Sequence, residues 1–104
     1  TSGTLRFIKK LCIRVKEIAA ICAAPSVLGK LGILEGKQAV CYPGFEEQLT
    51  GAEVLKQEVA RQDNVTTSRG LGTAIPFALE LIAQLYDEEK AEEIRKSIIF
   101  HAEI

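Results

Sequence analysis

The 104-residue chain is long enough for one small domain, and 47% of its residues are hydrophobic, so a core can form. Its net charge of −1 argues against a nucleic-acid-binding surface. No apolar run reaches the roughly 20 residues that a membrane span requires. We therefore expect residues 1–104 to form a single domain that binds neither nucleic acid nor a membrane.

Hydrophobic spacing and turn residues predict helices that alternate with strands. The first part of the chain predicts a basic-faced amphipathic helix with Leu5, Ile8, Cys12 and Val15 on its apolar stripe, a wholly apolar strand at 18–21, a helix opened by Pro25 and a strand at 38–42. A short helical or loop segment at 45–49 then leads to a hairpin with strands at 58–61 and 64–67 and to a tight loop at 68–73. Two helices follow, one with Ile75, Ala78, Leu79, Ile82 and Leu85 on one stripe, and a last one capped by Asp87 with Ala91, Ile94 and Ile98 inward.

This order predicts an α/β fold in which helices sandwich a largely parallel sheet. The apolar strand at 18–21 should then be covered on both faces. A doubly wound sheet usually holds about five or six strands, whereas this chain offers two convincing strands and a hairpin. We therefore expect one face or edge of the sheet to be bare. The absence of methionine also suggests that the chain is a fragment.

The three cysteines and the single histidine limit the possible chemistry. Cys12, Cys22 and Cys41 are odd in number and lack CxxC spacing, which argues against a disulfide framework or a zinc site. This cysteine usage fits a reducing compartment, so we expect a cytoplasmic protein. With His101 as the one histidine, we expect neither a metal nor a cofactor. Cys12 lies on an apolar stripe and is expected in the core. For Cys41, a structural and a redox role both stay open.

Cys22 stands where the apolar strand meets the start of a helix. Ala20 and Ala24, two residues before and after it, are both small, as the crowded turn of a nucleophile elbow requires. Such a turn presents the thiol at the carboxyl end of the strand, where ligands bind in open α/β sheets. The helix start favours the thiolate, and the Ala23 N–H is a candidate oxyanion donor. A buried structural cysteine at a strand end is the alternative interpretation.

Three segments resemble motifs of the ThiJ/PfpI superfamily, which is class I glutamine-amidotransferase-like. Residues 19–29 resemble its nucleophile-elbow segment, residues 41–46 the strand and loop that follow in ThiJ-like members, and residues 67–79 its Ser-Arg-Gly-Pro-Gly-Thr segment. The resemblance implies a flavodoxin-like three-layer sandwich with a mostly parallel sheet, of which this chain would be the C-terminal half. It also implies a homodimer.

For the site, the resemblance implies that Cys22 acts as a nucleophile or is oxidised to a sulfinic acid. It further implies an acidic residue, hydrogen-bonded to that thiol, from a strand far upstream of the cysteine. Only 21 residues precede Cys22, and Glu17 shares its strand but points elsewhere. We therefore expect the acid to belong to a missing N-terminal half, carried by another chain or by residues outside this sequence.

The chain also departs from the family pattern. Many members carry histidine where Tyr42 stands, and tyrosine is a poor general base near pH 7. Protease-like and several glyoxalase-like members place histidine directly after the cysteine, where this chain has Ala23, and this argues against peptidase activity. Leu71 replaces the proline of the later loop.

Two further candidates lie in that loop, Ser68 and Arg69. With the amides of residues 70–73 they form a helix start suited to a carboxylate, a phosphate or an oxidised sulfur. The alternative is an ordinary loop with Arg69 in a structural ion pair.

Two functions remain open. The first is a cofactor-free enzyme of glyoxalase or deglycase type, in which Cys22 attacks a small reactive carbonyl and Tyr42, Ser68 and Arg69 bind the substrate. The second is a non-catalytic redox sensor or chaperone-like stress protein in which Cys22 is oxidised.

Overall fold

A computed structural model describes residues 3–4, 6–7, 9–10 and 17–101. The described residues between 3 and 10 are helical, as predicted. The apolar residues on which the prediction of that helix rests lie outside the described residues, namely Leu5, Ile8, Cys12 and Val15. The core position expected for Cys12 therefore stays a prediction.

The elements follow the predicted alternation of strands and helices. They are β1 (Ile18–Ile21), α2 (Pro25–Lys30), β2 (Gln38–Ala39), η1 (Glu46–Gln48), β3 (Glu53–Val54), β4 (Val59–Gln62), β5 (Val65–Ser68), η2 (Leu71–Thr73), α3 (Ala74–Leu85) and α4 (Glu88–Ser97). The strand predicted over 38–42 forms a ladder only at its first two residues, where it pairs with β3, a short strand that the sequence did not signal. Within the described residues, no helix is long and apolar enough to cross a membrane.

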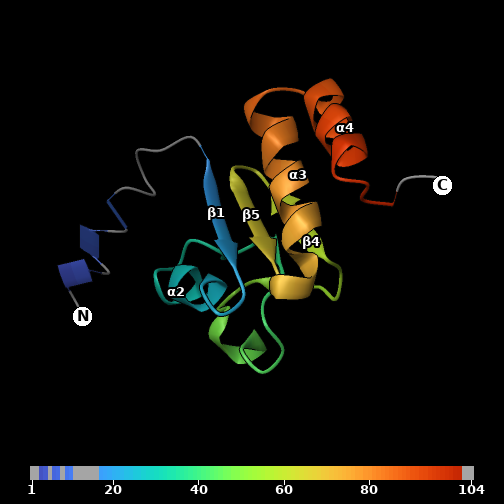
Figure 1. Cartoon of the computed structure of the whole chain (residues 1–104). Coiled ribbons are helices and arrows are strands. Elements are labelled where there is room, and N and C mark those ends of the chain that lie inside the picture. The colour runs from blue at the N-terminus through green and yellow to red at the C-terminus, as the bar shows by residue number, and fades with distance from the viewer. Residues whose placement is uncertain (1–2, 5, 8, 11–16, 102–104) are drawn as a thin grey trace.

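The strands form two small sheets. The first has the order β1-β5-β4, with β1 parallel and β4 antiparallel to β5 (Figure 1). The predicted hairpin of β4 and β5 is confirmed, and Asp63 takes a left-handed conformation (φ 55°) in its turn. The second sheet pairs β2 with β3 in parallel. Strand β5 is therefore the centre of the larger sheet, and β1 pairs with it along one edge.

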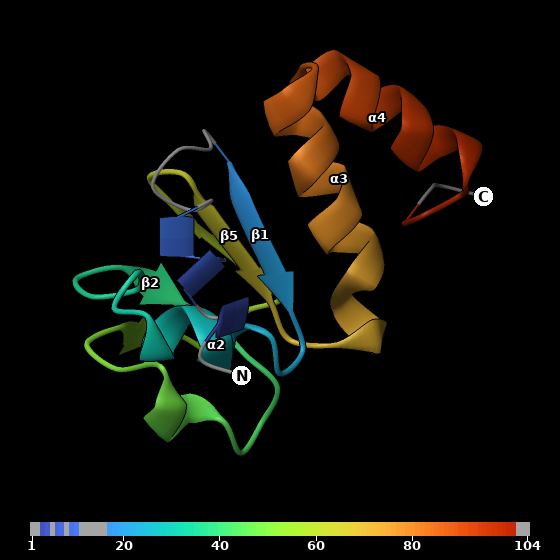
Figure 2. The same cartoon turned by 90° about the vertical axis from the view of Figure 1, so that its left-hand side faces the viewer.

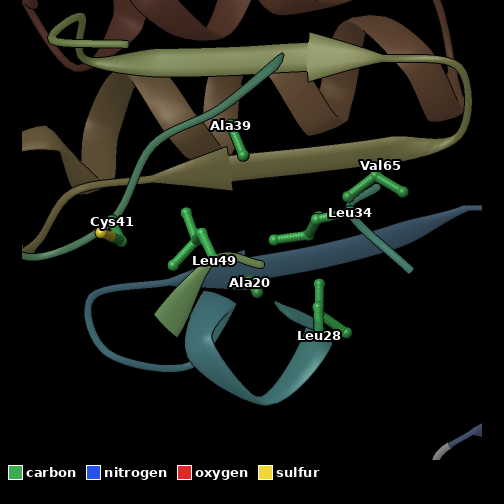
Figure 3. Packing of buried hydrophobic residues seen from close by; sticks show 7 residues of the cluster. All are labelled: Ala20, Leu28, Leu34, Ala39, Cys41, Leu49 and Val65. Carbon is green, nitrogen blue, oxygen red and sulfur yellow. The ribbon is translucent and has the colours of Figure 1, made fainter. Parts of the chain in front are cut away.

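Helices lie on both sides of the larger sheet. Figure 2 shows α3 and α4 on one side and α2 on the other, which is the predicted α/β arrangement. The core lies on the α2 side, where buried side chains from α2, β1, β5 and the loops converge (Figure 3). Its members are Ala20, Leu28, Leu34, Ala39, Cys41, Leu49 and Val65. This core fixes β1 and α2 relative to each other, and so fixes the turn between them.

The α3 side of the sheet is less completely covered. Ala19 of β1 is exposed, so the prediction that this strand is covered on both faces is wrong. The reason is that the strands α3 mainly contacts are β5 and β4. In the predicted α3 stripe, Ile75, Ala78 and Leu85 are also exposed, Ile75 by 44% and Leu85 by 67%, and no residue of α3 is buried. The expectation of a bare face agrees with this structure.

The predicted cap of the last helix is confirmed. Asp87 accepts a hydrogen bond at its Oδ1 from the backbone N–H of Lys90 at 2.7 Å. Ala91 and Ile94 are half-buried as predicted, but Ile98 is 49% exposed. The helical spacing fails at Ile98 because α4 ends at Ser97 and the chain turns away there.

Gly29 of α2 packs directly against the backbone of η1 and the residue after it. A Cβ at this position would lie 2.2 Å from the Gln48 carbonyl oxygen and 2.8 Å from the Leu49 Cα. Gly29→Ala should therefore lower the free energy of unfolding by about 2 kcal/mol or more, because rigid backbone would have to move. Gly72→Ala is the matched control, since a Cβ there meets no atom within 4 Å. Equal stability of the two variants in urea unfolding would contradict this packing.

Candidate active site

The turn between β1 and α2 has the conformation of a nucleophile elbow. Cys22 has a φ of 66°, in the left-handed region that residues with a side chain rarely adopt. The chain reverses there within a few residues, and the Ala24 N–H donates to the Ile21 carbonyl at 3.2 Å. Ala20 is buried in the core, whereas Ala24 is exposed. The strained backbone at Cys22 is the signature that distinguishes an elbow from an ordinary strand end.

Both backbone groups of Cys22 are held by neighbouring segments. Its N–H donates to the carbonyl of Ser68, the last residue of β5, at 3.1 Å. Its carbonyl accepts a hydrogen bond from the Tyr42 N–H at 2.8 Å. The elbow is therefore fixed at the end of β5 and at the segment after β2, and these hydrogen bonds bring the backbones of Cys22, Tyr42 and Ser68 together. The Cys22 side chain is partly exposed.

The predicted oxyanion donor, the backbone N–H of Ala23, lies in a suitable environment. Its carbonyl accepts hydrogen bonds from the N–H and the hydroxyl of Ser26, at 3.0 and 2.7 Å. Its own N–H has no hydrogen-bond partner within the part of the chain that the structure describes. A free N–H beside a partly exposed thiol can donate to an oxyanion that forms at that sulfur.

Tyr42 lies at the rim of the site. Its side chain is 48% exposed and meets Phe45 edge to face, with ring centroids 6.4 Å apart. The ring also lies against Gly70, where an added Cβ would be 3.5 Å from the tyrosine Cδ1. Tyr42 therefore connects the elbow to the loop at 68–73, through its backbone on one side and its ring on the other.

Ser68 and Arg69 occupy that loop in different environments. Ser68 is fully buried, and its hydroxyl donates to the Glu58 carbonyl at 2.7 Å. This hydroxyl is already engaged within the fold, so Ser68 contributes to the elbow through its backbone carbonyl. Arg69 is half-buried and forms no ion pair among the residues described. The alternative of a structural ion pair therefore finds no support there, and the guanidinium is available to an anion.

The charge of Arg69 acts on the neighbouring loop. Burial raises the pKa of the Cys41 thiol, and the Glu46 carboxylate adds to this rise, while Arg69 opposes it. Arg69 also helps to lower the pKa of Glu46, after the backbone N–H groups of Glu46 and Gly44. Cys41 is 2% exposed, so it is both less accessible than Cys22 and held in its protonated form.

Two further features bear on the site. No group of three or more His, Cys, Asp or Glu side chains placed to hold a metal occurs in residues 17–101 or in the described positions before them. A cavity of about 270 Å³ lies between α3 and α4, next to Leu79 and Arg95, and its walls include none of the predicted site residues. The candidate site is therefore the surface around Cys22.

Comparison with known proteins agrees with this geometry. The model of the DJ-1/PfpI family matches residues 1–84, which include the elbow and the loop at 68–73. This chain belongs to the DJ-1/PfpI family. The resemblance to the ThiJ/PfpI superfamily is thereby confirmed, and α4 lies beyond the matched residues.

Individual relatives cover most of the chain. Protein dj-1beta of Drosophila melanogaster is 43% identical over 84 residues, which are 79% of this chain and 45% of that protein. The Glutathione-independent glyoxalase DJR-1.2 of Caenorhabditis elegans is 36% identical over 78% of this chain and 44% of that protein. The structure of oxidized Toxoplasma gondii DJ-1 superposes with a TM-score of 0.83 at 36% identity, over 94% of this chain and 54% of that one.

These comparisons show a flavodoxin-like fold of which this chain carries a part. The chain spans about half the length of the curated relatives that it matches. The predicted fold class is confirmed.

Proposed function

We propose that this protein acts on small reactive carbonyl compounds, in the manner of a glyoxalase or deglycase. The observation that carries this proposal is the partly exposed Cys22 in a strained elbow, next to the free N–H of Ala23. A thiol so placed can attack an aldehyde carbon, and the N–H can stabilise the oxyanion that results. The name of the Caenorhabditis elegans relative supports this class of chemistry.

Methylglyoxal illustrates the proposed reaction. The Cys22 thiolate attacks the aldehyde carbon, a carbon–sulfur bond forms, and the aldehyde oxygen becomes the oxyanion held by the Ala23 N–H. The hydrogen of that carbon then moves to the neighbouring keto carbon as a proton, through an enediol. This oxidises the first carbon to a thioester and reduces the second to an alcohol. Water cleaves the thioester to give lactate and the free thiol, so the reaction needs neither a metal nor a cofactor.

The other site residues take supporting roles in this proposal. Tyr42 lies at the rim and can donate its phenolic hydrogen to a substrate oxygen. Arg69 carries the positive charge for an anionic group of the substrate or product. Ser68 acts through the carbonyl that holds the Cys22 N–H. We propose no peptidase step, because Ala23 cannot act as a base.

Proton transfer needs an acidic group, and we propose that a complementary N-terminal half of the fold supplies it. Strand β1 pairs on one side only among the described strands, and Ala19 on this strand is exposed. The relatives are about twice as long as this chain, which fits an N-terminal half of about the same length as this chain. We further propose that the protein is a homodimer. We also propose that it is cytoplasmic, since the free thiols of Cys22 and Cys41 fit a reducing compartment.

The test of this function is the production of lactate from methylglyoxal. We expect the full-length protein to form lactate and Cys22→Ser to lose at least about 100-fold of that rate, because the hydroxyl is a far weaker nucleophile near pH 7. Cys41→Ser is the matched control and should keep the rate within about threefold, since the buried Cys41 does not contact substrate. The proposal fails if neither the wild type nor Cys41→Ser forms lactate.

The second candidate is a non-catalytic redox sensor or chaperone-like stress protein. It is favoured by the contrast between the two described cysteines, since Cys22 is partly exposed and Cys41 is 2% exposed with a raised pKa. Exposed thiolates are oxidised first, to the sulfenic and then to the sulfinic acid. In this function Cys22 would report oxidation rather than turn over a substrate.

Mild peroxide treatment followed by mass spectrometry tests the second candidate. We expect the mass of the intact protein to rise by about 16 or 32 Da, for one or two added oxygens, with the added mass on the peptide that carries Cys22. Cys22→Ser should abolish the first addition, and Cys41→Ser should leave it in place. Oxidation that occurs only at Cys12 or Cys41 would contradict a sensing role for Cys22.

A further inference from the structure

The hydroxyl of Thr73 lies at the centre of the loop at 68–73. Its Oγ1 accepts hydrogen bonds from the backbone N–H groups of Arg69 and Gly70, at 3.2 and 3.1 Å. The same oxygen lies 2.7 Å from the Ser68 hydroxyl and 3.0 Å from the Gly70 carbonyl. One side chain therefore contacts three of the residues that lead from β5 into the loop.

The direction of these hydrogen bonds follows from the donors available. A hydroxyl has one hydrogen, and the Glu58 carbonyl, 2.7 Å from the Ser68 hydroxyl, can only accept. Ser68 therefore donates to Glu58. The single hydrogen of Thr73 then goes to its nearer acceptor, the Ser68 hydroxyl at 2.7 Å, and not to the Gly70 carbonyl at 3.0 Å. The two remaining lone pairs of Thr73 receive the N–H groups of Arg69 and Gly70. The result is one oriented chain of hydrogen bonds that ends at the Glu58 carbonyl, just before β4.

The residues that contact the Thr73 hydroxyl also hold the elbow in place. The carbonyl of Ser68 holds the Cys22 N–H, and Gly70 supports the ring of Tyr42, whose N–H holds the Cys22 carbonyl. The residue between them, Arg69, has no ion-pair partner among the described residues. The backbone that carries this cation is thus fixed by Thr73, next to the strand end that holds the Cys22 N–H.

We propose that Thr73 is a positioning residue, which fixes the Arg69 backbone next to the Ser68 carbonyl that holds the Cys22 N–H, so that the Arg69 cation favours anionic reactants at the Cys22 thiol. This inference rests on the proposed site around Cys22, but it does not require any particular turnover. It assigns the hydroxyl of Thr73 a role in selectivity that the aliphatic part of the side chain cannot perform.

Two alkylating reagents of similar size test the proposal without a substrate. Iodoacetate is anionic and iodoacetamide is neutral. The rate constant of iodoacetate at Cys22 divided by that of iodoacetamide therefore rises with the local positive charge. We expect this ratio to fall by about threefold or more in Thr73→Val, which removes the hydroxyl at nearly constant volume. Thr73→Ser keeps the hydroxyl and should restore the ratio. Peptide mapping assigns each alkylation to Cys22.

A matched control separates positioning from general destabilisation. Thr66→Val removes another hydroxyl from β5, one that pairs with Gln84 of α3 rather than with the loop. We expect the ratio in Thr66→Val to equal that of the wild type. An unchanged ratio in folded Thr73→Val, or an equal fall in Thr66→Val, would overturn the proposal. Because no turnover is measured, this failure is distinct from an absence of lactate.

Amide hydrogen exchange in the unmodified protein tests the same network should Thr73→Val fail to fold. The N–H groups of Arg69 and Gly70 should exchange more slowly than in an unstructured peptide, by about tenfold or more, because Thr73 accepts both. Exchange of both amides at the unstructured rate would overturn the proposal.

Discussion

The left-handed backbone of Cys22 is the constraint on which the site depends. A residue with a Cβ costs about 1–2 kcal/mol in that region, so the surrounding structure must stabilise it. The Cys22 N–H donates to the Ser68 carbonyl and the Cys22 carbonyl accepts from the Tyr42 N–H, and these two hydrogen bonds supply part of this stabilisation, at about 1 kcal/mol each. The buried side chain of Ala20 anchors the preceding strand in the core. Strand β5 and the segment after β2 therefore meet at Cys22, where their hydrogen bonds stabilise its left-handed backbone.

The same constraint separates the two described cysteines. The elbow turns Cys22 out of the strand and leaves it partly exposed, whereas Cys41 is buried as part of the hydrophobic core. Burial and the carboxylate of Glu46 raise the pKa of the Cys41 thiol. Reactivity should therefore concentrate at Cys22, whether the chemistry is carbonyl attack or oxidation.

Features fixed by local sequence could be predicted. The small residues around Cys22, the hairpin turn and the Asp87 cap each depend on a few neighbouring residues, and the structure contains all three. The exposure of Ala19 could not be predicted, because it depends on where α3 crosses the sheet. The same holds for Ser68, whose hydroxyl meets a carbonyl ten residues away.

Thr73 was missed as a site residue for a related reason. Its place three residues after Gly70, at the start of a helix, is a local signal for a hydroxyl that accepts backbone N–H groups. Its contact with Ser68 depends on the path of the whole loop, and so does the link from Ser68 to Cys22. The sequence therefore indicated the nucleophile and its turn, but not the hydrogen bonds that hold them.

The measurement that tests the elbow most directly compares the stabilities of Cys22→Gly and Cys22→Ala in urea. Glycine accepts a φ of 66° without strain, so Cys22→Gly should be more stable than Cys22→Ala by about 1 kcal/mol. At Ala24, where φ is −59°, glycine should instead destabilise the protein by about 0.5–1 kcal/mol. If Cys22→Ala were as stable as Cys22→Gly, or more so, the strained elbow would be contradicted.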